Sequence, residues 1–220
     1  MATKRVGKRV EKIDEEGFSK DRIELVSLKR ETLVIPLIGL SPVIIHKFSD
    51  KAKRMMLAAQ QGNKAKQHDP KDPVIDAEAA CYRLEDGTPG MPAVAFKGAI
   101  VAGCRFFSGI TMTQTKMMIF VEGEGPEQLV AIIGEQILRE DTVRLASGVS
   151  DLRYRYMFWP WSVSLTVSYH ASVMSRNSLI ALVEAGGSAG IGDWRPSAPK
   201  SNTGTFGRFA INTEKEIQVI

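Results

Sequence analysis

The residues best suited to chemistry with a ligand lie in a glycine-rich stretch near the C-terminal end of the sequence. It begins Ala-Gly-Gly-Ser-Ala-Gly-Ile-Gly-Asp-Trp-Arg-Pro at residue 185 and continues to Phe-Gly-Arg-Phe at 206–209. Glycines let a backbone approach a ligand closely, and a nest of N–H groups from the four glycines between 186 and 192 could face a phosphate. The candidate nucleic-acid-binding residues here are Gly190, Gly192, Trp194, Arg195, Lys200 and Arg208. The alternative is a linker whose Trp194 packs on a sheet.

A second group of residues interleaves arginines with aromatic side chains. Residues 153–159 read Arg-Tyr-Arg-Tyr-Met-Phe-Trp. Guanidinium planes and aromatic rings stack on unpaired bases, and each aromatic contact is worth roughly 1–3 kcal/mol. We therefore predict that Arg153, Tyr154 and Arg155 contact a single strand. Interfaces between subunits are enriched in the same residue types, so a role in self-association stays open.

Further basic residues could contact phosphates. Lys97 lies in an otherwise apolar helical pattern, and the helix predicted over 51–60 has a basic face. The residues of that face are Lys51, Lys53 and Arg54. The alternatives are a lysine whose apolar stem follows the edge of the core, and a face that is simply solvated.

Residues able to perform acid–base catalysis are few. One polar segment holds a histidine and three aspartates, His68, Asp69, Asp72 and Asp76. A carboxylate beside an imidazole could cleave RNA or hold a metal ion, but a solvated acidic turn explains the same composition. Only Asp72 is kept as a catalytic candidate, and we expect a protein that is not an enzyme. The histidines and cysteines lack metal-ligand spacing, and no glycine run continues as Gly-Lys-Ser/Thr, so no metal or cofactor is predicted.

The composition is that of an ordinary globular chain. Of 220 residues, 44% are hydrophobic and 25% charged, and the net charge of +4 permits an acidic partner without demanding one. No apolar run is long enough to cross a membrane, and the N-terminus has no signal-peptide pattern. We therefore expect a cytoplasmic protein, without membrane contact, in which Cys81 and Cys104 are reduced.

Hydrophobic patterning predicts alternating strands and helices after a charged N-terminal arm at 1–22. A largely apolar stretch broken by prolines at 30–48 indicates a first strand, and period-two alternation at 161–170 indicates a long half-buried strand. The other predicted elements are helices at 51–60, 91–107 and 178–185, a loop at 62–76, a hairpin at 82–90, short strands within 111–148 and a last strand at 206–211.

This order predicts an α+β fold. A first strand and helix, and a final strand, helix and strand, suit a ferredoxin-like, RRM-like βαββαβ core with a glycine-rich loop before the last strand. We expect one nucleic-acid-binding domain over 23–220, with inserted loops at 61–90 and 111–158.

Three stretches resemble the RAMP superfamily, the RNA-binding backbone subunits of CRISPR effector complexes used in antiviral defence. The stretch 37–45 resembles the family's first strand, 91–105 is similar to its Lys-Gly-Ala helix, and 186–208 resembles its glycine-rich loop. The resemblance implies the fold above, single-stranded RNA as ligand, a homo-oligomeric filament along the strand, and other effector subunits as partners. The segments Asp-Leu-Arg-Tyr-Arg at 151–155 and Gly-Ile-Gly-Asp-Trp-Arg-Pro at 190–196 also resemble segments of proteins encoded by phages and prophages.

One departure from the family bears on catalysis. Ribonuclease members have an aspartate before an Asn-Pro turn, whereas here Lys71 stands in the aspartate's place and Asp72 in the asparagine's. We therefore expect sequence-tolerant binding of single-stranded RNA without cleavage. The alternatives are a phage protein that handles single-stranded DNA, a guide-dependent ribonuclease that uses Asp72, and a virion structural protein.

Overall fold

The computed structural model describes residues 27–48, 50–62, 71–144, 148, 150–199 and 202–220. The arm expected at 1–22 lies outside the described residues, as do His68, Asp69 and Lys200. The strands are β1 (Arg30–Gly39), β2 (Val43–Ile44), β3 (Tyr82–Arg83), β4 (Pro89–Pro92), β5 (Ile119–Glu122), β6 (Leu129–Ala131), β7 (Ile133–Arg144), β8 (Ser150–His170), β9 (Phe209–Ile211) and β10 (Gln218–Val219). The helices are α1 (Asp50–Gln60), α2 (Pro73–Ala79), α3 (Ala93–Gly103), η1 (Cys104–Phe106), α4 (Met112–Met118) and α5 (Arg176–Ala189).

The central strand is β8, whose 21 residues serve two parts of the main sheet. Its C-terminal half pairs with β1 on one edge and with β5 on the other. Its N-terminal half pairs with β7 along one edge and with β2 along the other. All these pairings are antiparallel, so the described part of the chain is a mixed α/β molecule with antiparallel sheets. A smaller sheet has the order β3-β4-β6.

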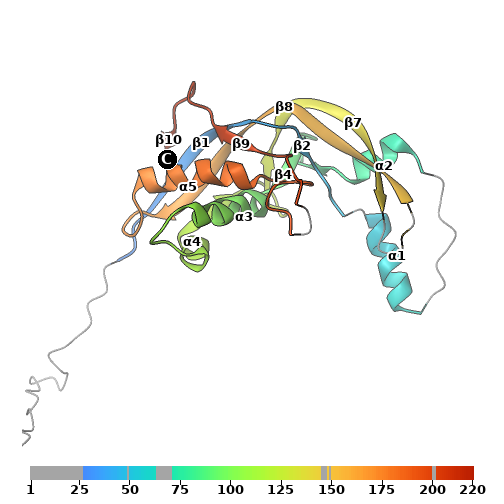
Figure 1. The fold of residues 1–220 in the computed structure, drawn as a ribbon, viewed down its shortest axis with the longest axis horizontal. Coiled ribbons are helices and arrows are strands. Elements are labelled where there is room, and N and C mark those ends of the chain that lie inside the picture. The colour runs from blue at the N-terminus through green and yellow to red at the C-terminus, as the bar shows by residue number, and fades with distance from the viewer. Residues whose placement is uncertain (1–26, 49, 63–70, 145–147, 149, 200–201) are drawn as a thin grey trace, which may run out of the picture.

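Helices α3 and α5 cover one face of the four strands ordered β9-β1-β8-β5 (Figure 1). Alternation along β1 and β8 supplies the apolar face beneath them, which includes the fully buried Leu33, Ile35 and Leu165. Phe96 of α3 and Leu182 of α5 fill the space between the helices and this face. The long strand predicted at 161–170 is therefore present, and it extends back to Ser150.

A bulge separates the two halves of β8. The pairing with β7 shifts between Gly134 and Gln136, opposite the exposed Trp159 and Pro160. Because β8 has two residues here where β7 has one, Phe158 on one side of the bulge and Trp161 on the other are both buried. The ribbon of β7 and β8 beyond the bulge arches away from the helices (Figure 1).

Helix α5 is longer than the sequence predicts. We expected it to end at Gly186, but it continues to Ala189. The reason is packing: a Cβ on Gly186 would lie 3.0 Å from the backbone of Ile100, and one on Gly187 would lie 1.8 Å from the carbonyl oxygen of Phe209. These glycines let α3 and β9 approach the helix, which offsets their low helix propensity.

Two predictions for the connecting segments are wrong in part. The loop expected at 62–76 ends early, because Asp72 caps α2 and Pro73 occupies its first turn. The region 111–148, for which we predicted only short strands, begins with α4, whose Thr111 and Gln114 form a capping box. Within the described residues, no helix is long and apolar enough to cross a membrane.

Candidate nucleic-acid interface

The ribbon of β7 and β8 presents charged side chains on one of its faces. Arg139 lies directly opposite Arg155, and Asp141 lies opposite Arg153. Because side chains on one face are two residues apart, these four project to the same side of the ribbon. The opposite face carries Tyr154, which packs against the core. Burial and the carboxylate of Glu140 raise the pKa of the Tyr154 phenol.

Arg155 is the centre of a buried ionic network. Its side chain is only 3% exposed, its Nη2 donates to Asp141 Oδ2 at 2.7 Å, and its Nη1 donates to Asp193. Asp141 also accepts from Nε of Arg139 at 2.9 Å. The Asp193 carboxylate reaches further, to Nδ1 of His46 at 2.9 Å. The network therefore ties the ribbon to the glycine-rich loop and to the chain after β2.

The glycine-rich loop is held against β2 by its own backbone. Asp193 N–H donates to the carbonyl of Ile44, Ile191 N–H to that of Gly207, and Gly207 N–H to that of Pro42. Gly192 and Gly207 have φ of +73° and +66°, a conformation that favours glycine. The predicted phosphate-facing nest is wrong in this respect: Gly186 and Gly187 are helical, and Gly190 N–H donates to the carbonyl of Gly186.

The loop places Trp194 over the two arginines. The Arg139 and Arg155 guanidinium carbons lie 5.2 and 5.4 Å from the centroid of the indole ring. The Phe206 ring meets the indole at 69° with centroids 5.7 Å apart, and Arg139 also lies 5.2 Å from the Phe206 ring. Arg139 keeps 29% of its side chain exposed, so it is the arginine of this cluster that solvent reaches. We call Arg139, Arg155, Trp194 and Phe206 the arginine–aromatic cluster.

The electrostatics of Asp193 follow from these contacts. Burial alone would raise the pKa of its carboxyl group. The hydrogen bond from His46 and the charges of His46 and Arg155 outweigh burial and hold this pKa below its ordinary value. Asp193 is therefore a fixed negative charge that anchors the loop beside the ribbon.

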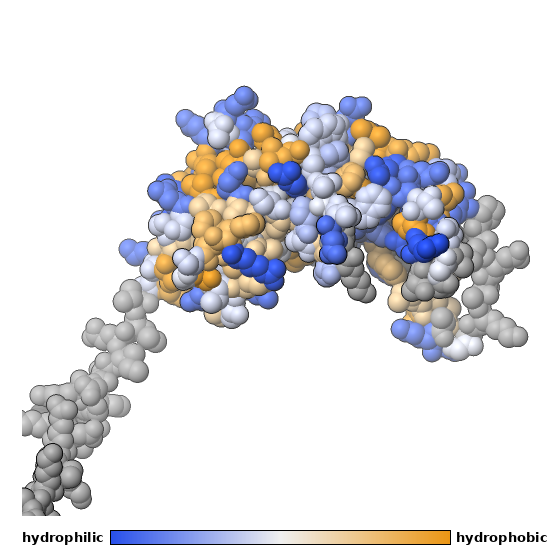
Figure 2. Space-filling model, viewed as in Figure 1, coloured by the Kyte–Doolittle hydropathy of each residue, from blue (hydrophilic) through white to orange (hydrophobic). Residues whose placement is uncertain are grey.

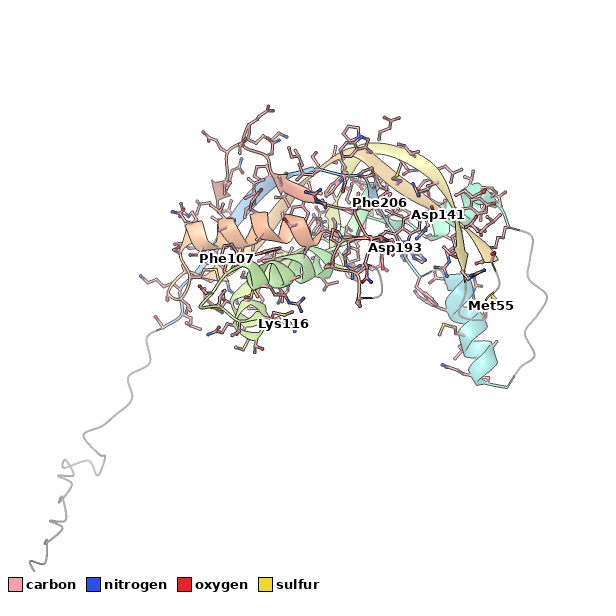
Figure 3. The ribbon with its side chains drawn as sticks, in the orientation of Figure 1. Met55, Phe107, Lys116, Asp141, Asp193 and Phe206 are labelled. Carbon is pink, nitrogen blue, oxygen red and sulfur yellow. The ribbon has the colours of Figure 1, made fainter. Side chains whose placement is uncertain are left out.

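Figure 3 shows how the cluster lies in the molecule. Asp141, Asp193 and Phe206 gather beneath the arch of β7 and β8, whereas Met55 lies on α1 and Phe107 and Lys116 lie at the other end. The surface below the arch is hollowed between the body and α1 (Figure 2). Asp141, Asp193 and Phe206 therefore lie on the arch side of the molecule, away from Phe107 and Lys116.

The structure brings only some of the predicted site residues together. Gly192, Trp194, Arg195 and Arg155 meet at the cluster, where Arg195 Nη1 donates to the carbonyl of Gly192 at 2.9 Å. Arg153 is half-buried on the same face of the ribbon. Arg155 has little surface left for a base, since its guanidinium is buried between two carboxylates.

The remaining predicted cations lie elsewhere. Arg208 is exposed beside the cluster's loop, and its backbone N–H is bonded to Ser41. Lys53 pairs with Asp50 within α1, and Arg54 Nε donates to the Asp50 carbonyl. The side chain of Lys51 lies outside the described residues. Lys97 lies 4.9 Å from the Phe120 ring, at the other end of the sheet.

Sequence reasoning missed Arg139, Asp141, His46, Asp193 and Phe206. Arg139 and Asp141 are two residues apart on β7 and so share one face of the strand. That spacing does not indicate a site until the register with β8 is known. His46 and Asp193 are 147 positions apart, so only the fold joins them.

The catalytic candidate Asp72 lies at the start of α2. Asp72 accepts hydrogen bonds from the N–H groups of Val74 and Ile75 at 3.0 and 2.9 Å, so it serves as the N-cap of α2. Within the described residues, no three histidines, cysteines or carboxylates gather as a metal site would require. Cys81 and Cys104 are free and buried, and burial raises the pKa of the Cys81 thiol to about 11.

Comparisons with known proteins found similar solved structures. A scan against protein-family models and a search of curated proteins each gave no match. The type III-B Cmr-beta complex bound to cognate target RNA matches at a TM-score of 0.41 and 11% identity, over 87% of this chain and 61% of that one. Cmr6 from Pyrococcus furiosus matches at a TM-score of 0.37 and 10% identity, over 84% of this chain and 98% of that one. This chain thus spans about three fifths of the Cmr-beta chain that it matches.

Proposed function

We propose that the protein binds single-stranded nucleic acid, and that the arginine–aromatic cluster is the centre of the binding surface. The observation that carries this proposal is the partly exposed guanidinium of Arg139 lying over both Trp194 and Phe206. A cation beside aromatic rings matches the two parts of an unpaired strand, its phosphates and its bases. RNA is the ligand that the sequence resemblance to the RAMP superfamily implies.

Binding of this kind is tolerant of sequence. Every base has a π-face, so stacking does not select among bases, and phosphate contacts carry no sequence information. Arg139, Arg153, Arg195 and Arg208 supply positive charge on or beside the cluster. Affinity therefore falls as salt rises, because each neutralised phosphate releases condensed counterions.

The fold that we propose for this role is a ferredoxin-like βαββαβ core over one domain at 23–220. Two features support it: the strand order β9-β1-β8-β5, and the helices α3 and α5 that connect β1 to β5 and β8 to β9. Each helix joins two strands with one strand between them, as in a split βαβ unit. The ribbon of β7 and β8 and the segment from α1 to β4 are additions to this core.

We further propose that copies associate along the strand, with room for other protein subunits. Support comes from apolar surface at two places. Met55, Met56 and Leu57 of α1 are 38%, 54% and 54% exposed. A groove of about 700 Å³ lies between α4 and α5, with Phe107 and Val173 in its lining. Apolar surface of this kind commonly marks protein contacts.

Co-purification tests the proposed function. We expect the purified protein to carry nucleic acid, seen as a raised ratio of absorbance at 260 and 280 nm, and RNase to remove it while DNase does not. If DNase alone removes the nucleic acid, the ligand is single-stranded DNA and not RNA. Light scattering before and after digestion then measures whether the oligomer depends on the strand. Oligomers that never contain or bind nucleic acid would contradict the proposal and indicate a purely structural protein.

A further inference from the structure

A small hollow borders the arginine–aromatic cluster. It measures about 280 Å³ and is lined by Trp194, Thr203, Gly204 and Phe206. The indole and the Phe206 ring form two of its walls, since they meet at 69°. Pockets for drug-sized ligands span about 300–1,000 Å³, so this hollow suits a single flat ring system.

The indole wall is fixed in place by the surrounding chain. Trp194 has φ of +56°, which is rare for a bulky residue and is often found where a ligand is held. Phe206 N–H donates to the Trp194 carbonyl at 3.2 Å, and a Cβ on Gly204 would lie 2.5 Å from that carbonyl oxygen. Arg139 and Arg155, neighbours across the ribbon, both approach the indole. The corner between the rings therefore exists before any ligand arrives.

The lining indicates which ligand the corner would take. None of its four residues is charged, so the corner does not attract a phosphate by itself. Arg139 lies at its side and can meet a phosphate attached to whatever occupies it. A flat apolar slot next to a cation fits a nucleobase that is joined to a phosphate backbone.

We propose that the corner between Trp194 and Phe206 takes one unpaired nucleobase, which stacks on the indole while its phosphate lies near Arg139. This inference rests on the proposed binding of single strands and adds that the base itself is required. A base inside a duplex is already stacked on both sides and cannot enter. The corner therefore distinguishes single from double strands.

The test compares two strands that differ only in their bases. Binding of a 12-nucleotide adenine RNA and of an abasic strand of equal length is measured with wild-type protein, Trp194→Leu and Phe206→Leu. We expect wild type to bind the adenine strand about tenfold more tightly than the abasic strand, as stacking of one base would give. Both variants should lose most of this preference, so that each binds the adenine strand and the abasic strand with nearly equal affinity.

Tryptophan fluorescence gives a second readout. Trp159, which is 39% exposed and lies at the bulge of β8, provides the control variant Trp159→Phe. The adenine strand should quench the emission of wild type and of Trp159→Phe, and the abasic strand should not. Equal affinity of wild type for both strands, or for a duplex, would overturn the base corner and leave the proposed function standing. Binding of neither strand at low salt would overturn both.

Discussion

Arg155 joins the ribbon of β7 and β8 to the glycine-rich loop by pairing with two carboxylates. Its side chain is 3% exposed and forms ion pairs with Asp141 and Asp193. Asp141 in turn accepts a hydrogen bond from Arg139, and Asp193 directly precedes Trp194 in the loop. A buried charge with both partners in place is tolerated, whereas removal of one partner leaves an uncompensated charge. Arg155, which we predicted to contact a single strand, is thus buried and pairs with the same Asp141 that accepts a hydrogen bond from the exposed Arg139.

Acid should weaken this arrangement through Asp193. Its folded-state pKa is lowered, so it contributes stability that is complete above the unfolded pKa of about 3.9 and is lost as pH falls through the folded value. We expect Asp193→Asn to be less stable than wild type at pH 7, and the two proteins to converge as pH falls below the lowered folded-state pKa of Asp193. Urea unfolding at successive pH values measures the difference.

The matched control is Glu135→Gln, which removes an exposed carboxylate on β7. It should leave the pH dependence of unfolding as in wild type. If Asp193→Asn loses as much stability as wild type does when the solution is acidified from pH 7, the contacts to His46 and Arg155 do not hold the loop.

At the scale of elements, close packing by glycine decides how α5 meets its neighbours. Gly103 of α3 and Gly186 of α5 face each other, and a Cβ on Gly103 would lie 2.6 Å from the Gly186 nitrogen. The sequence pattern gives the apolar helix but not its length, because glycine normally ends a helix. Only the neighbouring backbone explains why this helix continues.

Two glycine-to-alanine variants distinguish the effect of close backbone packing from the effect of helix propensity on stability. Gly187→Ala should destabilise the protein by about 2 kcal/mol or more, since its Cβ would lie 1.8 Å from the Phe209 carbonyl oxygen. Gly98→Ala on α3 has open space around the new Cβ, so better helix propensity should stabilise it by about 0.5–1 kcal/mol. Thermal unfolding of both variants measures whether each one is less or more stable than wild type. Equal effects would contradict the close contact of α5 with β9.

The sequence predicts the elements better than it predicts the site. Period-two alternation correctly indicated the strand at 161–170, and small apolar residues correctly indicated helix α3. The site depends on the register of β7 with β8, which sets Arg139 opposite Arg155, and on contacts such as His46 with Asp193. Neither follows from local pattern, because register and long-range pairing are fixed by the packed sheet.

At the scale of the whole molecule, the packed core and the arginine–aromatic cluster lie in different parts of the fold. Helices α3, α4 and α5 lie at one end, the arch of β7 and β8 extends toward α1 and α2 at the other, and Asp141, Asp193 and Phe206 lie beneath the arch (Figures 1 and 3). The surface there is notched between the body and α1 (Figure 2). This arrangement fits the proposed strand-binding surface beneath the arch.

The most direct test of that claim is the affinity for a labelled single-stranded RNA, measured by fluorescence anisotropy over a series of salt concentrations. Wild type should bind at low salt with an affinity that falls steeply as salt rises. Arg139→Gln should bind more weakly and with a log–log salt slope smaller by about 0.7, the value for one phosphate contact on a single strand. Lys116→Gln, an exposed change on α4 away from the cluster, should match wild type. No binding by wild type at low salt, or equal slopes for all three proteins, would contradict the account.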